Sequence, residues 1–308
     1  MDEIYDVMVL GAGAAGLTAG IYSSRAKLKT LILNEGAIGG QMVLTNEIAN
    51  YPGVETTNGY VVANTMKKQA KDFGCDIKSN VKITGHHLNK EIKSVELEDG
   101  RIYNSWSVIL APGGKPRPLG IPGEDDFKGT GISYCATCDG EFFTGKELIV
   151  VGGGNSALEE AVTLTKYATK VTIVHQFDEF QAFEHAVQEA RKNPKIDFIM
   201  ESELRGFFGN GALEKVTVEH LPTGTISERT IDGVFIFIGY LPNTESLKSH
   251  VALNGRNEII TDADMKTNIS GVFAAGDCIA KKYRQITTAV AEGTIAALSA
   301  AEYLRILK

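Results

Sequence analysis

Two cysteines three positions apart, Cys135 and Cys138, are the residues of this chain best suited to redox chemistry. Thiols at this spacing can close a disulfide in a tight turn or at the first turn of a helix, where the helix dipole favours the attacking thiolate. Asp139 places a carboxylate directly beside the second sulfur, where it can relay protons as the pair opens and closes. The segment 135–140 therefore predicts a catalytic dithiol with an adjacent acid–base group.

A C-x-x-C spacing is also found as half of a zinc site. Zinc needs four ligands, which a second such pair usually supplies. The other cysteines, Cys75 and Cys278, stand alone with no histidine at ligand spacing. A redox pair is therefore favoured over a zinc site, and no metal is expected.

Composition narrows the class of protein. The 308 residues suffice for two domains, and 43% of them are hydrophobic. A net charge of −7 without any basic run gives no support to nucleic-acid binding. The acidic N-terminus lacks the features of a signal peptide, no apolar run approaches a membrane span, and four cysteines do not form a secreted disulfide framework. These features predict a soluble cytoplasmic protein that makes no membrane contact.

The N-terminal segment has the pattern of a dinucleotide-binding unit. A short apolar strand at 5–10 leads into the turn Gly11-Ala12-Gly13-Ala14-Ala15-Gly16, then a helix over 17–26 and a strand over 30–33. Glycines at these positions let the backbone approach a pyrophosphate, and the helix N-terminus supplies free N–H groups. The strand ends at Asn34 and Glu35, where a carboxylate can accept hydrogen bonds from a ribose hydroxyl pair.

The same pattern recurs after the cysteines. A strand at 147–151 precedes the glycine turn 152–157, a helix follows over 158–167, and a strand at 171–174 ends at His175. Two nucleotide-binding units in one chain usually pass a hydride from one dinucleotide to another, and the cysteine pair lies between the two in the sequence.

Breaker-rich segments divide the chain. Prolines and glycines crowd residues 112–123, and an apolar strand at 234–238 is closed by 239–242. The alanine-rich segment 285–307 has helical periodicity and can pack on the first unit. We therefore predict an α/β protein of two Rossmann-like three-layer domains, the second inserted into the first. Residues 1–113 and 242–308 form one domain, and residues 114–241 form the other.

Together these motifs resemble the low-molecular-weight thioredoxin reductases over essentially the whole chain. The similarity extends to five further stretches: Gly39-Gly40-Gln41, Asn50-Tyr51-Pro52-Gly53, Cys135-Ala136-Thr137-Cys138-Asp139-Gly140, the run from Gly271 to Asp277, and Tyr283-Arg284-Gln285. The resemblance implies a homodimeric flavoprotein that reduces thioredoxin, with a middle domain that rotates to bring the disulfide and the nicotinamide in turn to the flavin.

By the same resemblance, Cys138 faces the flavin, Cys135 attacks the partner disulfide and Asp139 relays protons. The first unit and the C-terminal segment bind FAD. The residues expected to contact FAD are Gly11, Gly13, Ala14, Ala15, Gly16, Asn34, Glu35, Gly40, Gln41, Asn50, Gly276, Asp277, Arg284, Gln285 and Ile286.

The chain departs from this family at the nicotinamide site. In the family, the strand after the second glycine turn ends in a His-Arg-Arg run with a further Arg, a clamp for the 2′-phosphate of NADPH. Here the stretch reads His175-Gln176-Phe177, and no Lys or Arg occurs between Lys170 and His185. An unpaired phosphate among carboxylates should cost roughly 2–3 kcal/mol of binding. NADPH is therefore not the expected donor.

Two donors remain open. NADH needs only the glycine turn and a ribose contact from His175 or Asp178, whereas a ferredoxin-dependent branch of the family lacks the clamp and reduces the flavin directly. We favour ferredoxin because no acid of the kind that NAD-specific folds carry ends the strand. The residues assigned to a degenerate nicotinamide site are Gly152, Gly154, Asn155, Ser156, Ala157 and His175.

Three other functions fit the same scaffold. A dithiol oxidase would send electrons from a dithiol to oxygen and would also lack the clamp. An ordinary NADPH-dependent thioredoxin reductase is the second alternative. A non-catalytic flavin-bearing redox sensor is the third, and the intact cysteine motif argues against it.

Overall fold

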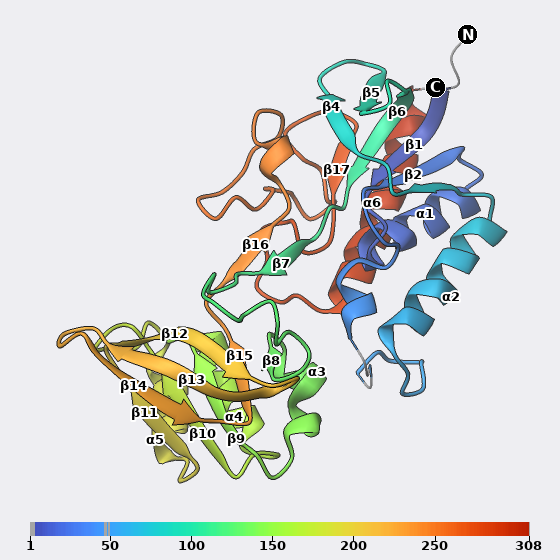
Figure 1. Cartoon of the computed structure of the whole chain (residues 1–308). Coiled ribbons are helices and arrows are strands. Elements are labelled where there is room, and N and C mark those ends of the chain that lie inside the picture. The colour runs from blue at the N-terminus through green and yellow to red at the C-terminus, as the bar shows by residue number, and fades with distance from the viewer. Residues whose placement is uncertain (1–3, 46–47, 49, 308) are drawn as a thin grey trace. The chain divides into compact units, whose positions relative to one another are not determined.

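The computed structural model describes residues 4–45, 48 and 50–307, with only the backbone described at Leu44, Thr137 and Cys138. The chain divides into two compact units (Figure 1). Unit 1 comprises Met1–Lys115 and Leu241–Lys308, and unit 2 comprises Pro116–Tyr240. The predicted division placed the boundaries after residues 113 and 241. Which cofactor each unit binds remains a prediction at this point.

Unit 1 is built on one mixed sheet with the strand order β3-β2-β1-β6-β5-β4, and β17 pairs with β6. Its strands are β1 (Ile4–Leu10), β2 (Thr30–Asn34), β3 (Asp76–Ser79), β4 (Ile83–His87), β5 (Lys93–Leu97), β6 (Ile102–Leu110) and β17 (Val272–Ala274). The pairs among β1, β2, β3, β6 and β17 are parallel, whereas β4 and β5 form an antiparallel extension. Continuous burial of the second half of β1 explains its unbroken apolar sequence, because both faces of a central parallel strand are covered.

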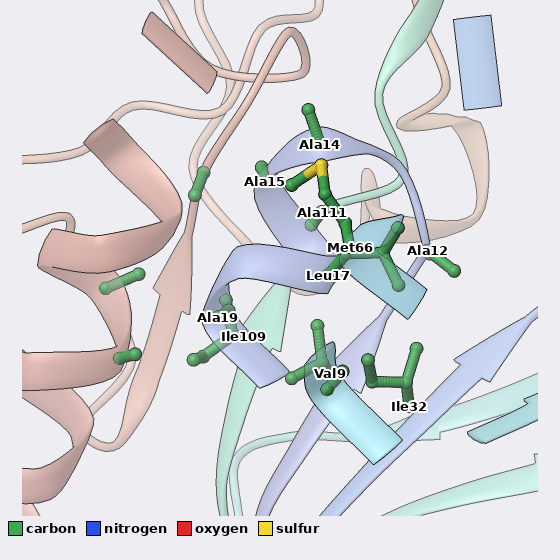
Figure 2. Close-up of a cluster of buried hydrophobic side chains, with 14 of the residues drawn as sticks. Val9, Ala12, Ala14, Ala15, Leu17, Ala19, Ile32, Met66, Ile109 and Ala111 are labelled. Carbon is green, nitrogen blue, oxygen red and sulfur yellow. The ribbon is translucent and has the colours of Figure 1, made fainter. Parts of the chain in front are cut away.

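The helices of unit 1 are α1 (Ala14–Arg25), α2 (Gly59–Asp72), α6 (Ile286–Leu307), and the short 3₁₀ turns η1 (Gly40–Leu44) and η3 (Glu245–Leu247). Helix α1 carries small residues where it meets its neighbours. A Cβ at Gly293 of α6 would lie 2.2 Å from the carbonyl oxygen of Ala15, so the two helices cross in close backbone contact. Figure 2 shows the apolar side chains that pack beneath the first glycine turn, including Val9, Leu17 and Ile32.

Unit 2 has three layers. A parallel sheet of order β11-β10-β9-β15-β8 lies at its centre, and an antiparallel meander of order β12-β13-β14 forms a second sheet. The strands are β8 (Ile132–Ser133), β9 (Glu147–Val151), β10 (Lys170–Val174), β11 (Ile196–Ile199), β12 (Ser202–Gly209), β13 (Leu213–His220), β14 (Thr225–Thr230) and β15 (Gly233–Ile236). Helices α4 (Asn155–Leu164) and α5 (Glu184–Lys192) bury one face of the parallel sheet, and the meander buries the other. The cysteine segment follows β8 as α3 (Ala136–Asp139) and the 3₁₀ turn η2 (Gly140–Phe143).

The two chain crossings between the units, β7 (Gly114–Pro116) and β16 (Tyr240–Pro242), pair as a two-stranded sheet. The predicted α/β class is confirmed. Both glycine-turn helices begin three residues earlier than predicted, at Ala14 and Asn155, because the last residues of each turn already have helical hydrogen bonding. Within the described residues, no helix combines the length and the apolar character that a membrane crossing requires.

Candidate redox and nucleotide sites

The first glycine turn is shaped by two close backbone approaches. A Cβ at Gly11, whose φ is +109°, would lie 2.1 Å from the carbonyl oxygen of Ala111 at the end of β6. A Cβ at Gly16 would lie 1.9 Å from the carbonyl oxygen of Gly11, so α1 can start directly against the strand. Neither position accepts a larger residue without moving the backbone.

The outer surface of this turn is open. A Cβ at Gly13 would meet no atom within 4 Å, and no side chain caps the N-terminus of α1 there. Gly40 comes within contact distance of Gly13, since its Cβ would lie 3.3 Å from the Gly13 Cα. Uncapped N–H groups beside open space fit the pyrophosphate of a dinucleotide. Ala14 and Ala15 are buried in the core below.

Asn34 and Glu35, at the end of β2, have different roles. Asn34 Oδ1 accepts a hydrogen bond from the Ala12 N–H at 2.9 Å, and its Nδ2 donates to the Gly36 carbonyl at 2.5 Å. Asn34 therefore shapes the turn from behind. Glu35 is exposed, and its Oε1 accepts a hydrogen bond from the Ile83 N–H at 2.9 Å, which orients the carboxylate and leaves its other oxygen for a ligand.

The C-terminal segment meets the same turn. A Cβ at Gly276, whose φ is +86°, would lie 2.9 Å from the Ala15 Cβ. The next residue, Asp277, forms an ion pair with Lys281, whose Nζ lies 2.9 Å from Asp277 Oδ1. Lys281 Nζ also contacts Glu292 Oε2 at 2.8 Å, and the same oxygen accepts a hydrogen bond from the Gly276 N–H.

This Asp277–Lys281–Glu292 triad is a feature that our sequence reasoning missed. The Lys281 side chain is only 9% exposed, so its charge is held by the two carboxylates. Burial raises the pKa of Glu292, and the adjacent Lys281 opposes that rise. The spacing of Asp277 and Lys281, four residues apart, was the available signal, but Glu292 lies on α6 and only the fold reveals its contact.

Other predicted FAD residues come together near the start of α6. Asn50 Nδ2 lies 3.4 Å from Gln285 Oε1, although 235 positions separate them. Arg284 pairs with Glu258, which is buried with 3% exposure. Gln41 is exposed in η1, and Ile286 is the first residue of α6.

The cysteine segment lies at the edge of the sheet of unit 2. Cys135 is in an extended conformation at the N-cap of α3 and is disulfide-bonded. The Asp139 N–H donates to the Cys135 carbonyl at 3.1 Å, which closes the turn. The side chain of Cys138 lies outside the described residues, so its predicted pairing and flavin-facing role stay predictions.

Asp139 is bonded to Ser133, the last residue of β8. Ser133 Oγ donates to Asp139 Oδ2 at 2.6 Å and accepts from the Cys135 N–H at 3.1 Å. Burial raises the pKa of Asp139, and the Ser133 hydrogen bond works against that rise. Ser133 was not among the predicted site residues, because a serine two positions before a cysteine carries no distinctive signal.

The remaining cysteines are free and buried. Burial raises the pKa of both Cys75 and Cys278 to about 12, so neither thiol ionises at neutral pH. Among the described residues no group of three or more potential ligands could hold a metal ion.

The second glycine turn has the same backbone design as the first. A Cβ at Gly152, whose φ is +137°, would lie 2.4 Å from the Phe237 carbonyl oxygen, and the position of Gly154 is open. Gly153 is packed by His175, whose Cε1 would lie 2.2 Å from a Cβ there. Ala157 is buried in the core and Ser156 is exposed.

The loop that follows β10 closes on this turn. The Gln181 N–H donates to the Gly153 carbonyl at 2.9 Å, and the Phe183 N–H donates to Asn155 Oδ1 at 2.7 Å. His175 is 5% exposed, stacks on Phe180 and has Nε2 at 3.2 Å from the Glu179 carbonyl. Two predicted nicotinamide-site residues, Asn155 and His175, are therefore engaged within their own unit.

The outer surface of this loop carries no cation. Gln176, Asp178 and Glu179 are exposed, and the Phe177 ring is 44% exposed. Phe183 is 71% exposed. The positions where a phosphate clamp would stand thus present amides, carboxylates and aromatic rings to solvent.

A pocket of about 370 Å³ in unit 2 lies elsewhere. Glu147 and Lys170, the first residues of β9 and β10, help to line it. The glycine turn follows the opposite end of β9. The described residues that line the pocket include none of the glycine turn, so it is not the position at the carboxyl ends of β9 and β10 where a dinucleotide would bind.

Comparison with known proteins shows which family this chain belongs to. The model of the family described as pyridine nucleotide-disulphide oxidoreductase matches residues 5–293. The chain is 44% identical to a thioredoxin reductase of Peptoclostridium acidaminophilum, over 99% of this chain and 98% of the relative. The crystal structure of thioredoxin reductase from Streptococcus pyogenes is 39% identical, with a TM-score of 0.87 and coverage of 99% and 100%. A ferredoxin-flavin thioredoxin reductase from Clostridium acetobutylicum is 29% identical, with a TM-score of 0.53 and coverage of 98% and 99%.

Proposed function

The chain belongs to the pyridine nucleotide-disulphide oxidoreductase family, and we propose that it passes electrons from a donor other than NADPH, through FAD and the Cys135–Cys138 disulfide, to thioredoxin. It is an FAD-dependent oxidoreductase that acts on a disulfide. Beyond that activity, we infer which residues act, which protein accepts the electrons and which donor supplies them. The observation that carries this proposal is a cysteine turn with a half-buried acid, in a unit whose glycine turn has no phosphate clamp.

In this proposal FAD lies on the first glycine turn. The open position at Gly13 and the uncapped start of α1 hold its pyrophosphate. Glu35 would bind the adenosine ribose with its other carboxylate oxygen, and Asp277, which Lys281 holds in place, would contact the ribityl portion. When bound, FAD supplies the electron pair that opens the disulfide.

The dithiol then reduces thioredoxin in two exchanges. The Cys135 thiolate attacks the thioredoxin disulfide, so that a mixed disulfide forms and one thioredoxin sulfur leaves as a thiolate. The Cys138 thiolate attacks Cys135, which closes the 135–138 disulfide and releases the second thioredoxin thiolate. Asp139 gives and takes the protons that the sulfurs exchange, because its raised pKa lets it hold a proton nearer to neutral pH than an exposed aspartate does.

The loop after β10 carries the evidence on the electron donor. NADPH carries a doubly charged 2′-phosphate, and this loop offers it exposed Asp178 and Glu179 and no Lys or Arg. The loss of the ionic contacts should weaken NADPH by about two orders of magnitude. Reduced ferredoxin is the favoured donor, and NADH is the second candidate because it needs no clamp. The likeness to a ferredoxin-flavin thioredoxin reductase supports the first choice.

Trapping the exchange intermediate tests the catalytic assignment. Cys138→Ser leaves the attacking thiol and removes the resolving one, so it should accumulate a covalent complex with thioredoxin that dithiothreitol releases. Cys135→Ser is the matched control and should trap nothing. A complex that forms on Cys135→Ser instead would reverse the two roles. No complex with either variant, together with rapid oxygen consumption in the wild type with a small dithiol, would favour a dithiol oxidase.

A further inference from the structure

The Ser133 side chain touches both the acid and the backbone of the cysteine turn. It is 5% exposed on β8, and its hydroxyl oxygen lies 2.6 Å from Asp139 Oδ2 and 3.1 Å from the Cys135 amide nitrogen. The Cys135 carbonyl oxygen lies at 3.4 Å from the same hydroxyl. Resting on the proposed function, we propose that Ser133 is a positioning residue that keeps the Asp139 carboxyl bonded in both of its protonation states during proton relay.

A hydroxyl is suited to this task because it has one rotatable proton and two acceptor lone pairs. While Asp139 is ionised, the Ser133 proton points to Oδ2, the shorter contact. When Asp139 gains a proton, the acid can donate to the Ser133 oxygen, and the Ser133 proton turns to the Cys135 carbonyl. The Cys135 N–H donates to the hydroxyl oxygen in either state and holds it in place. The carboxyl therefore keeps one position while its charge changes.

The electrostatic surroundings of Asp139 fit this role of Ser133. Burial raises the pKa of Asp139, and the Ser133 hydrogen bond lowers it. The neighbouring titratable groups are Cys135 on the same turn, exposed Glu141 after it, and Tyr167, whose ring packs on Gly140.

Removal of this hydroxyl should raise the pH midpoint at which Asp139 titrates. A hydrogen bond to a charged group corresponds to a shift of about one to two pH units, and its loss penalises the ionised form. The rate at which the dithiol reduces thioredoxin should change with pH in parallel. Ser133→Thr retains the hydroxyl, so its Asp139 titration should have the wild-type pH midpoint.

The experiment uses the full FAD-loaded chain, labelled with ¹³C at aspartate carboxyls, and titrates Asp139 by NMR with Asp139→Asn to assign the signal. The same proteins, reduced anaerobically with dithionite, are mixed with oxidised thioredoxin across pH. We expect Ser133→Ala to shift both titrations upward by at least about one pH unit. Ser202→Ala is the matched control, a buried serine of the same unit whose hydroxyl donates to the Met200 carbonyl at 2.8 Å, and it should shift neither.

If Ser133→Ala lowers the melting temperature but leaves both titrations at their wild-type positions, Ser133 has only a structural role and the inference is wrong. An equal shift in Ser202→Ala would overturn it as well. Should Ser133→Ala fail to fold, Ser133→Gly removes the same hydroxyl and is read in the same way. Failure of the proposed function is distinct, because then the wild-type dithiol would not reduce thioredoxin at any pH.

Discussion

At the scale of single residues, the acid beside the cysteines differs from an ordinary aspartate because of its surroundings. Asp139 follows the second cysteine, is half-buried, and has a pKa raised by burial. Its adjacency to a C-x-x-C in the sequence predicts a relay role, and that role stays a prediction. The sequence could not predict Ser133 as the partner of Asp139, since that contact exists only where β8 ends beside α3.

Asp139→Asn separates catalysis from stability. Because the folded pKa is raised, ionisation opposes folding as pH rises from the ordinary aspartate value through the folded pKa, and the cost persists above it. The amide removes that cost, so the variant should melt at a higher temperature than the wild type at pH 8, with a smaller gain at pH 5. Thioredoxin reduction should fall by about a hundredfold while FAD stays bound. Unchanged turnover, measured with a saturating donor, would remove Asp139 from the mechanism.

Lys281 is the second residue whose importance appears only in the folded chain. Without its ammonium, the carboxylates of Asp277 and Glu292 would face one another partly buried. Lys281→Met should therefore weaken FAD binding by at least about tenfold and lower stability by up to about 3 kcal/mol.

The effect of Lys281→Met should depend on pH. Loss of the cation raises the pKa of Glu292 further, so the carboxyl is more often neutral at pH 6 than at pH 8, and repulsion is relieved at the lower pH. The loss of FAD affinity, measured by flavin fluorescence, should thus be larger at pH 8 than at pH 6. Lys266→Met, which breaks an exposed pair with Asp264, is the control and should have no effect. Equal FAD affinity in both variants would show that the triad does not support the cofactor.

At the scale of elements, the two glycine turns share one backbone design and differ in what surrounds them. The strand–turn–helix pattern and its glycines were readable from the sequence because each close approach needs a glycine at a set position. The contacts of the loop after β10 with Gly153 and Asn155 were not readable, because they depend on how an irregular segment folds back.

Matched alanine substitutions test which turn carries a dinucleotide. Gly13 and Gly154 hold the same place in the two turns, have negative φ, and leave open space for a Cβ. Both variants should fold with similar small losses of stability. Gly13→Ala should weaken FAD at least about tenfold by filling the pyrophosphate position. Gly154→Ala should leave unchanged the rate of thioredoxin reduction with reduced ferredoxin as the donor. A large loss in the ferredoxin-driven reaction from Gly154→Ala would show that the second turn is still needed.

Rebuilding the clamp tests the loop after β10. Gln176→Arg, Phe177→Arg and Gln181→Arg replace three exposed side chains with guanidinium groups. If only phosphate recognition is missing, the triple variant should gain NADPH-driven flavin reduction, with NADPH favoured over NADH by about tenfold or more. A second triple variant with uncharged substitutions at the same positions (Gln176→Asn, Phe177→Leu, Gln181→Asn) controls for disturbance of the loop. If the arginine variant gains nothing, the loss of nicotinamide binding extends beyond the clamp.

At the scale of the whole molecule, the proposed function requires electrons to pass from a donor through FAD to the disulfide of Cys135. The order of the units along the chain followed from repeated patterns and from breaker-rich boundaries. The family is evident in both the sequence and the fold. This chain departs from the family pattern in the loop after β10, which carries no Lys or Arg, and the donor that we propose follows from that difference.

Anaerobic bleaching of the flavin tests this account most directly. The oxidised protein is mixed in parallel with NADPH, NADH and reduced ferredoxin, and the flavin absorbance is followed in a stopped-flow instrument. We expect ferredoxin to bleach the flavin rapidly, and NADPH to be slow and no faster than NADH. Bleaching by micromolar NADPH within seconds would contradict the account and return the protein to the NADPH-dependent members of its family.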